Sequence, residues 1–278
     1  MPKVKKAIVR KSLLSVVVPI YKQEKTIKKD LTRINQVLAD TRFSYEIIAV
    51  VDGKTVDNSF KEVKKLKLPN LKVIGYQDNR GKGYAIRFGM AKSKGDKIAF
   101  IDSGMDIDPN GISMIIEHIE WYDADIIVGS KRHPASQVEY PLLRKVYSIG
   151  YQIGLKILFG LNIKDTQAGL KIFKREVLMD VLPRLLIKRF AFDIELLAVA
   201  KRLGYKKIFE APIKIDTKAF NFSSTIKFKT VFEVLIDTLA VFYRLVILGY
   251  YDNGNNRKWK YDPELDYRIN TGKYESKN

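Results

Sequence analysis

The sequence predicts an α/β protein with a mostly parallel sheet covered by helices, followed by a C-terminal helical region. Two observations predict this class. Short β-branched runs that are apolar on both faces recur along the first 130 residues, as expected of strands buried on both sides. Between them, apolar residues recur every three or four positions, which is the period of an amphipathic helix. Alternation of these two patterns is typical of a helix-covered parallel sheet.

Five strands are expected in this first part, because each segment is a short apolar run that ends at turn residues. The first run ends at Pro19-Ile20, and the second is closed by Asp52-Gly53. The runs are too short to be told from helices by periodicity alone, but their length and β-branched content favour strands. The expected strands are Leu13–Ile20, Tyr45–Val51, Leu71–Tyr76, Lys97–Ile101 and Asp125–Gly129.

Helices are expected between these strands. In the first, Ile27, Leu31 and Ile34 share one face. The last begins at Asp108-Pro109, where an N-capping aspartate precedes a proline at the first helical position. The expected helices are Glu24–Ala39, Asp57–Leu66, Gly83–Ala91 and Pro109–Trp121.

After about residue 131 the pattern becomes mainly helical. A basic loop over 131–140 precedes an apolar-periodic stretch, and a polar loop over 162–171 follows it. The tail over 252–278 is polar and is expected to be weakly ordered, so we predict one domain over residues 1–251. The expected elements are helices at Leu142–Phe159, near Lys174–Val181, at Asp193–Leu203 and from about Ile226 to Tyr250, and a strand at Lys207–Ile213.

Composition narrows the chemistry. The chain has no cysteine, which excludes disulfides and thiolate metal sites, and only two histidines. A metal would therefore be held by carboxylates, which favours Mg²⁺ or Mn²⁺. The net charge of +19, from 50 Lys and Arg against 31 Asp and Glu, attracts polyanions, although a general lysine bias explains it equally well. The basic N-terminus is followed by an apolar run too short for a membrane span, so a cytoplasmic location is expected.

The candidate site follows from the predicted sheet, because open parallel sheets bind ligands at the carboxyl ends of their strands. Asp102, Asp106 and Asp108 come directly after the fourth strand. Like charges this close are costly without a counter-cation, which a divalent metal supplies while bridging to substrate phosphates. A plain turn is the alternative interpretation, and for Asp108 we favour the helix cap.

Other polar segments follow the remaining strands, and each alone is weak. Asp52 fits either a nucleoside contact or a plain turn. Lys82, in the Asn79-Arg-Gly-Lys-Gly segment, can meet a phosphate but does not match the P-loop pattern. Lys131 and Arg132 fit either a phosphate contact or a solvated basic loop. Two further segments carry acidic side chains: Asp165 to Lys171, which includes Gln167, and Phe192 to Glu195, which includes Asp193.

Together these segments resemble the family 2 glycosyltransferases with the GT-A fold, whose sheet is Rossmann-like. The resemblance covers about Leu13 to Gly249 and is closest to the branch that makes dolichyl-phosphate glucose or mannose. Two departures stand out: Gly104 occupies the second position of the family's Asp-x-Asp motif, and Val51 replaces the first Asp of Asp-Asp-Gly. Asp106 would compensate for the first departure, and the second leaves UDP and GDP both open. The matching segments are Val18-Pro-Ile-Tyr21 with Glu24, Asp52-Gly53 with Asp57, Asn79 to Gly83, Asp102 to Asp108, Gly129 to Arg132, Asp165 to Lys171 and Phe192 to Glu195.

The resemblance implies a division of labour along the chain. Residues 13–130 would bind the nucleotide sugar, residues 131–225 the acceptor, and residues 226–251 would form an interfacial helix. Asp102 and Asp106 would hold Mg²⁺ or Mn²⁺. The remaining implied roles are nucleotide-sugar binding by Pro19, Tyr21, Glu24, Asp52, Lys82 and Asp102, catalysis by Asp102, Asp106, Arg132 and Asp165, acceptor-phosphate binding by Lys131, Arg132, Arg144 and Lys171, and support by Gln167, Asp193 and Glu195.

The implied reaction is inverting transfer of a hexose from a UDP- or GDP-sugar to a polyprenyl (dolichyl) phosphate. A phosphate monoester is mostly dianionic at neutral pH, because its second pKa is about 6, so it needs cationic positioning rather than a general base. The Val231–Tyr250 stretch is apolar but carries Glu233, Asp237 and Arg244, which fits a helix lying in an anionic membrane surface. A core-packing helix is the alternative. The expected location is therefore cytoplasmic and peripheral to the membrane, and homo-oligomerisation stays open.

Three rival functions remain. A glycosyltransferase acting on a saccharide or protein would use the same donor site. A nucleotidyltransferase would share the sheet and the carboxylate-bound metal, but the glycine-rich basic signature expected near the first strand is missing. A basic nucleic-acid-binding protein is disfavoured, because the charges are scattered and no binding motif occurs.

Overall fold

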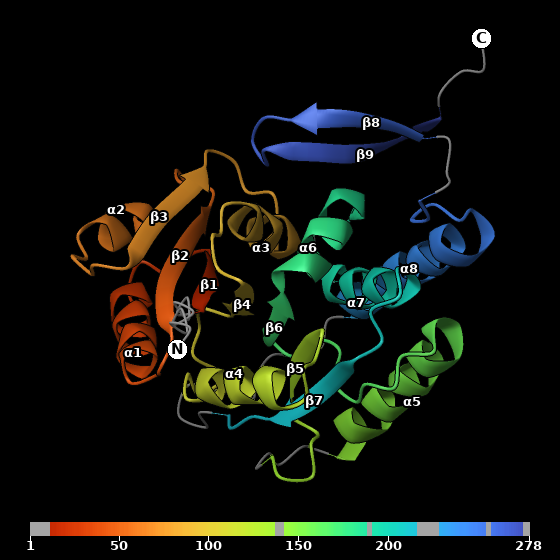
Figure 1. Cartoon of the computed structure of the whole chain (residues 1–278), viewed down its shortest axis with the longest axis horizontal. Helices are drawn as coiled ribbons and strands as arrows, with labels where there is room; N and C mark the ends of the chain where they lie inside the picture. Colours follow the sequence, from red (N-terminus) through yellow and green to blue (C-terminus); the bar gives the residue numbers. More distant parts are fainter. Residues whose placement is uncertain (1–11, 137–141, 188–190, 216–227, 254–256, 275–278) are drawn as a thin grey trace, which may run out of the picture.

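The computed structural model describes residues 12–136, 142–187, 191–215, 228–253 and 257–274. Figure 1 shows a central sheet with helices packed around it and a separate two-stranded sheet near the C-terminus. The seven strands of the central sheet lie in the order β3-β2-β1-β4-β6-β5-β7. They are β1 (Leu13–Ile20), β2 (Ser44–Asp52), β3 (Leu71–Tyr76), β4 (Lys97–Ile101), β5 (Ile126–Ser130), β6 (Leu170–Lys174) and β7 (Ile208–Pro212).

The strand pairing confirms the mostly parallel sheet. Strand β1 is parallel to both β2 and β4, β2 is parallel to β3, and β5 is parallel to β7. Only β6, between β4 and β5, runs antiparallel to its neighbours. The chain moves outward from β1 to β3 and then returns to place β4 on the other side of β1. This reversal predicts a ligand-binding crevice at the carboxyl ends of β1 and β4, as in other open α/β sheets.

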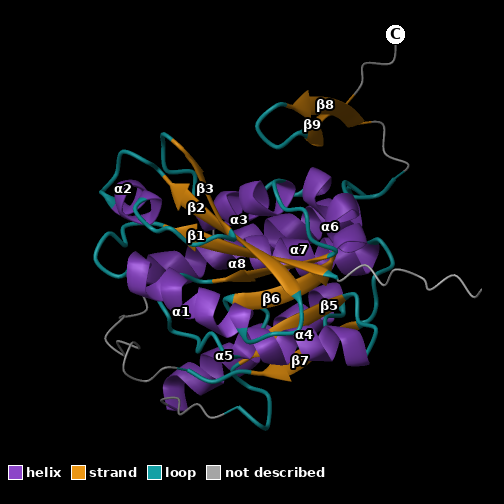
Figure 2. Ribbon diagram, turned by 60° about the vertical axis from the view of Figure 1, so that its left-hand side comes forward, coloured by secondary structure: helices purple, strands orange, loops and turns teal. Residues whose placement is uncertain are grey.

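Helices cover both faces of the sheet (Figure 2). One apolar core joins the sheet to α1 and α4, and the other joins it to α3, α6, α7 and the last helix. Alternate β1 residues point to the two cores, Val16 to one and Val17 to the other, and both are fully buried. The helices are α1 (Ile27–Ala39), α2 (Ser59–Lys64), α3 (Lys82–Ala91), α4 (Gly111–Trp121), α5 (Leu142–Phe159), α6 (Arg175–Val181), the 3₁₀ turn η1 (Leu182–Arg184), α7 (Phe192–Arg202), α8 (Phe228–Phe242) and the π-helical turn η2 (Tyr243–Ile247).

The structure corrects three expectations. A strand, β6, occupies part of what we expected to be a polar loop and helix start. The last helix, expected to run to Tyr250, is α-helical only to Phe242 and continues as the π-helical turn η2 to Ile247. The polar tail expected to be weakly ordered contains an antiparallel hairpin of β8 (Arg257–Asp262) and β9 (Tyr267–Tyr274).

Candidate active site

Asp102 lies at the carboxyl end of β4, in the predicted crevice. Its backbone N–H donates to the carbonyl of Gly169 (2.9 Å), at the start of the antiparallel strand β6. Its carboxylate lies against the α-carbon of Gly169, where an added Cβ would come within 2.0 Å of Oδ2. The Lys82 ammonium donates to the same Oδ2 (2.7 Å). Three elements that are distant in sequence therefore fix one carboxylate.

The other oxygen of this carboxylate, Oδ1, is buried and has no hydrogen-bond partner among the described residues. A buried carboxylate oxygen without a partner is costly unless a ligand satisfies it. Burial alone would lower the pKa of the Lys82 ammonium, but the charges of Asp102 and Asp193 outweigh it and leave that pKa raised. Lys82 therefore stays protonated and holds positive charge at the crevice.

Asp106 belongs to the same loop. Met105 before it has a left-handed backbone (φ +57°), which turns the chain. The loop is tied down beyond Asp106, where Ile107 pairs with Ile215 and the Asp108 N–H donates to the carbonyl of Lys214 (2.9 Å). Burial raises the pKa of Asp106, Lys131 lowers it, and the nearby charge of Asp102 raises it further. The two predicted carboxylates thus lie in one electrostatic environment.

These two carboxylates fit a divalent cation. Within the described residues, no group of three or more acidic or histidine side chains forms a complete metal site. Mg²⁺ and Mn²⁺ do not require one, because one or two carboxylates complete their shell with substrate phosphates and water. The unpartnered Oδ1 of Asp102 and its glycine-backed setting match such a site.

Asp108 does not share this environment. Its Oδ1 accepts hydrogen bonds from the Asn110 N–H (3.0 Å) and side chain (2.9 Å), and Arg33 lies 3.3 Å away. Helix α4 begins at Gly111, two residues later than expected. Asp108 therefore caps the turn that leads into the helix rather than the helix itself.

Asp52 secures the loop between β3 and α3. Its carboxylate accepts hydrogen bonds from the Asn79 side chain (2.8 Å) and from the N–H groups of Arg80 (2.7 Å) and Gly81 (3.0 Å). Gly81 has a φ of +97°, a conformation that favours glycine. Lys82 follows directly, so this loop connects the buried Asp52 to Asp102.

The predicted nucleoside segment after β1 lies beside the carboxylate loop. The Pro19 carbonyl accepts the Ser103 hydroxyl (2.5 Å), and Glu24 accepts the Asn58 N–H (3.0 Å). Tyr21, directly after β1, is 45% exposed. The sequence interpretation missed Gln23, whose side-chain nitrogen donates to the Ser103 carbonyl (3.1 Å) while its oxygen is buried without a partner among the described residues.

The basic segment after β5 is tied to the loop before β6. Asp165 accepts the Lys131 N–H (3.1 Å), and the Arg132 guanidinium donates to the Lys164 carbonyl (3.5 Å). Glu210, which sequence reasoning also missed, accepts the N–H groups of Lys164 (2.9 Å) and Asp165 (3.1 Å). Asp165 thus orients the segment that carries the two predicted cations.

The other predicted residues fall in different surroundings. Lys171 is fully buried, and its ammonium bonds to Asp193 (2.5 Å) and the Ala168 carbonyl (2.7 Å). It is therefore not presented to a bound acceptor in this structure. Gln167 is exposed. Arg144 lies in α5, but its side chain is outside the described part of the structure.

Glu195 is a buried support for the segment before α7. It accepts the N–H groups of Leu186 (3.0 Å) and Ile187 (2.8 Å) and the hydroxyl of Tyr251 (2.7 Å). Arg244 lies 3.5 Å away. Burial raises the pKa of Glu195, and these partners only reduce the rise, so its pKa stays above the usual value.

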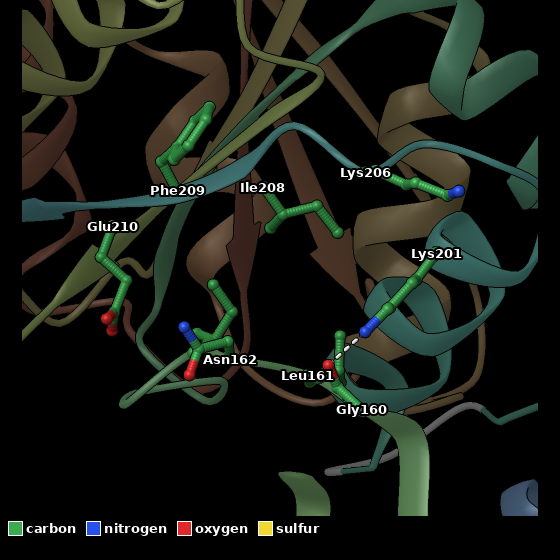
Figure 3. A pocket seen from close by; sticks show the side chains of 9 residues that line it. Gly160, Leu161, Asn162, Lys201, Lys206, Ile208, Phe209 and Glu210 are labelled. Carbon is green, nitrogen blue, oxygen red and sulfur yellow. Dashed lines mark hydrogen bonds between the residues drawn. The ribbon is translucent and has the colours of Figure 1, made fainter.

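A cavity of about 340 Å³ lies elsewhere, between the end of α5 and β7. Figure 3 shows Lys201 pointing to the Gly160 carbonyl at one side of it, with Glu210 at the other side. None of the predicted catalytic carboxylates lines it. Glu210 links it to the Asp165 loop by accepting the Asp165 N–H.

Comparison with known proteins identifies the family of this chain. The family model of glycosyl transferase family 2 matches residues 15–182. A dolichyl-phosphate beta-glucosyltransferase of Dictyostelium discoideum is 33% identical over 206 residues, covering 69% of this chain and 63% of that protein. The Homo sapiens protein of the same name is 33% identical over 208 residues, covering 68% and 63%. The chain thus spans about 63% of the length of these relatives.

Among solved structures, glucosyl-3-phosphoglycerate synthase from Mycobacterium tuberculosis, in complex with Mn²⁺, UDP-glucose and phosphoglyceric acid, superimposes with a TM-score of 0.61. The two chains are 16% identical, and the match covers 90% of this chain and 84% of that one. At this identity the likeness shows the fold alone, which is GT-A. The family match extends over more than half of the sequence, and the chain belongs to glycosyl transferase family 2.

Proposed function

We propose that this protein transfers glucose from UDP-glucose to a polyprenyl phosphate. The observation that carries the proposal is the Asp102 carboxylate, held by Lys82 and backed by Gly169, with one buried oxygen left unpartnered. The names of the curated relatives support glucose and a dolichyl phosphate. The structural relative was solved in complex with Mn²⁺ and UDP-glucose, which supports the donor and the cation.

A bound Mg²⁺ or Mn²⁺ would neutralise charge that develops on the departing diphosphate. Asp102 and Asp106 would hold it. Lys82 adds a fixed positive charge from the start of α3, and the helix N-terminus adds its partial charge. Such preorganised charge stabilises the transition state more than it does the ground state.

The acceptor half of the site has a different task. A phosphate monoester is already anionic at neutral pH, so the protein must orient it rather than deprotonate it. Lys131 and Arg132 are the candidates, because Asp165 and Lys164 fix the segment that carries them. We leave Lys171 out of this set, because its ammonium is enclosed with Asp193.

Membrane association is the second part of the proposal. Within the described residues, no helix is both long and apolar enough to cross a bilayer. Helices α5 and α8 pack together through Tyr151 and Thr238 (3.0 Å) and through the rings of Phe159 and Phe242 (6.2 Å). The α5–α8 apolar surface, which continues into η2, consists of side chains at least 43% exposed: Ile149, Ile153, Ile157, Phe232, Leu235, Ile236, Leu239, Tyr243, Val246 and Ile247.

This surface is expected to lie in the headgroup region of a membrane. Replacing Ile153 and Leu239 by Gln should weaken binding to vesicles of phosphatidylcholine and phosphatidylserine by about tenfold, because two apolar side chains would no longer enter the acyl boundary. Flotation measures the bound fraction. The matched control replaces Trp121 and Met179, which are 72% and 60% exposed elsewhere, by Gln. Equal flotation of both double variants would contradict the assignment.

The reaction is tested by incubating the protein with radiolabelled UDP-glucose, Mn²⁺ and a polyprenyl phosphate, followed by solvent extraction. Label is expected in the organic phase, and EDTA should abolish it. GDP-mannose replaces the donor in one arm, and 3-phosphoglycerate replaces the acceptor in another. Transfer to 3-phosphoglycerate but not to the lipid would replace the proposed acceptor with a soluble phosphate ester.

A further inference from the structure

The turn of the C-terminal hairpin contacts the loop between β3 and α3 (Figure 1). Glu264, in this turn, forms a two-pronged ion pair with the Arg80 guanidinium, and the second contact measures 3.2 Å. Tyr84 also donates to Glu264 (2.6 Å). The guanidinium lies over the rings of Tyr76 (5.0 Å) and Tyr84 (4.9 Å). Bidentate pairing and ring contact together define a single direction for the Arg80 side chain.

The backbone of the same loop belongs to the candidate donor site. The N–H groups of Arg80 and Gly81 donate to Asp52, and the next residue, Lys82, donates to Asp102. Residues 80–82 therefore have three partners: the backbone of Arg80 and Gly81 binds the buried Asp52, the Arg80 side chain binds the hairpin, and Lys82 binds Asp102, the candidate metal ligand. A displacement of Arg80 would be transmitted directly to Lys82, because only one residue separates them.

The hairpin is held independently of Glu264. Leu265 is buried, the Tyr267 hydroxyl accepts from Arg87 (3.0 Å), and Trp259 lies under Arg184 (5.2 Å). Asp262 shapes the turn by accepting the N–H groups of Glu264 (2.9 Å) and Leu265 (3.1 Å). Glu264 therefore contacts Arg80 from a turn whose conformation is fixed by other contacts.

An exposed ion pair alone contributes little, and the Glu264 side chain is 46% exposed. This acid, however, has two donors and a preformed turn. Its hydrogen bonds from Arg80 and Tyr84 lower its pKa, so it stays ionised at neutral pH. The contact also commits the Arg80 cation to the hairpin and leaves Lys82 as the loop's cation at Asp102.

We propose that Glu264 is a positioning residue, through which the C-terminal hairpin sets the loop 79–82 for binding of the donor diphosphate. The inference rests on the proposed function for its substrate, a nucleoside diphosphate sugar. It assigns a role in the donor site to a segment that the sequence pattern did not connect with it.

The test compares Glu264→Gln with Asp266→Asn, a carboxylate-to-amide change in the same turn that contacts Tyr261 within the hairpin. For E264Q we expect the KM for UDP-glucose to rise about tenfold and kcat to fall by a smaller factor, because the loop 79–82 loses its alignment, including Lys82, while Asp102 and Asp106 stay in place. D266N should leave KM unchanged. In the double variant R80Q/E264Q the effects should not add, because both remove one contact.

Hydrogen exchange of the Arg80 and Gly81 amides gives a readout independent of turnover. In E264Q these amides should exchange about tenfold faster than in the wild type, because their bonds to Asp52 open more often. Unchanged exchange and an unchanged donor KM would overturn the positioning role. Faster exchange in a protein that transfers no sugar to any acceptor would preserve the hairpin link to the loop and overturn the proposed function instead.

Discussion

Replacing Asp102 by Asn is expected to lower kcat/KM for sugar transfer by up to about a thousandfold, the upper end of the scale for loss of one electrostatic partner in a transition state. The amide is nearly the same size, so the packing against Gly169 would survive. It carries no charge, however, and would pair poorly with both Lys82 and a divalent cation. Initial rates with saturating Mn²⁺ measure the first effect, and Mn²⁺ binding in the presence of UDP measures the second.

The matched control is Asp108→Asn, a change of the same chemistry six positions along. Asp108 accepts hydrogen bonds from Asn110 in a turn, and Asn is equally suited to that place. Its transfer rate should stay within about threefold of the wild type, as expected for a cap that is retained. If D102N retained metal-dependent transfer at the wild-type rate, the assignment of this carboxylate to the metal would be wrong.

The central strands could be predicted because each contains several consecutive apolar residues. The central segments Leu13–Ile20 and Lys97–Ile101 were predicted with the bounds that the structure has. The edge strand Leu71–Tyr76, which is mostly half-buried, was also predicted with its observed bounds. Strand β6 was missed because it contains Lys171, which made the segment look like part of a solvated loop. Its charge is neutralised by Asp193, 22 residues away, and local patterning does not report such a distant partner.

The hairpin was missed for a related reason. Its strands are rich in charged residues, so the composition resembles that of a solvated tail. Its order depends on Arg80, Arg87 and Arg184, which lie far back in the chain and face the hairpin only after the main sheet has formed. Long-range contacts of this kind carry no periodic signal.

The candidate site was partly predictable. The rule that ligands bind at the carboxyl ends of parallel strands groups Asp52, Asp102 and the Lys131 segment. In the structure, the loop 79–82 links Asp52 to Asp102, and Lys131 is bonded to Asp165. The rule says nothing about which cations remain available. Lys82 and Lys171 were both assigned to substrate phosphates, on the donor and the acceptor side respectively. In the structure Lys171 is enclosed with Asp193, and Lys82 bonds to Asp102.

Gly169→Ala should reduce transfer by about a hundredfold without unfolding the protein, the cost expected when a reacting group moves by about 1 Å. A Cβ at this position would lie 2.0 Å from Oδ2 and 2.4 Å from Cγ of Asp102. The Asp102 carboxylate must therefore move. It would lose its hydrogen bond from Lys82, and its unpartnered oxygen Oδ1 would point in a different direction. The expected signature is a lower kcat together with weaker Mn²⁺ binding in the presence of UDP.

The same substitution at Gly150 is the control, because an added Cβ there meets nothing within 4 Å. Gly150 lies in α5, where Gly→Ala raises helix propensity by about 1 kcal/mol, so G150A should be at least as stable as the wild type and fully active. A G169A protein with normal kcat and metal binding would show that Asp102 can act from another position. In that case the close approach of Gly169 would serve packing alone, and the carboxylate would have no need of the glycine behind it.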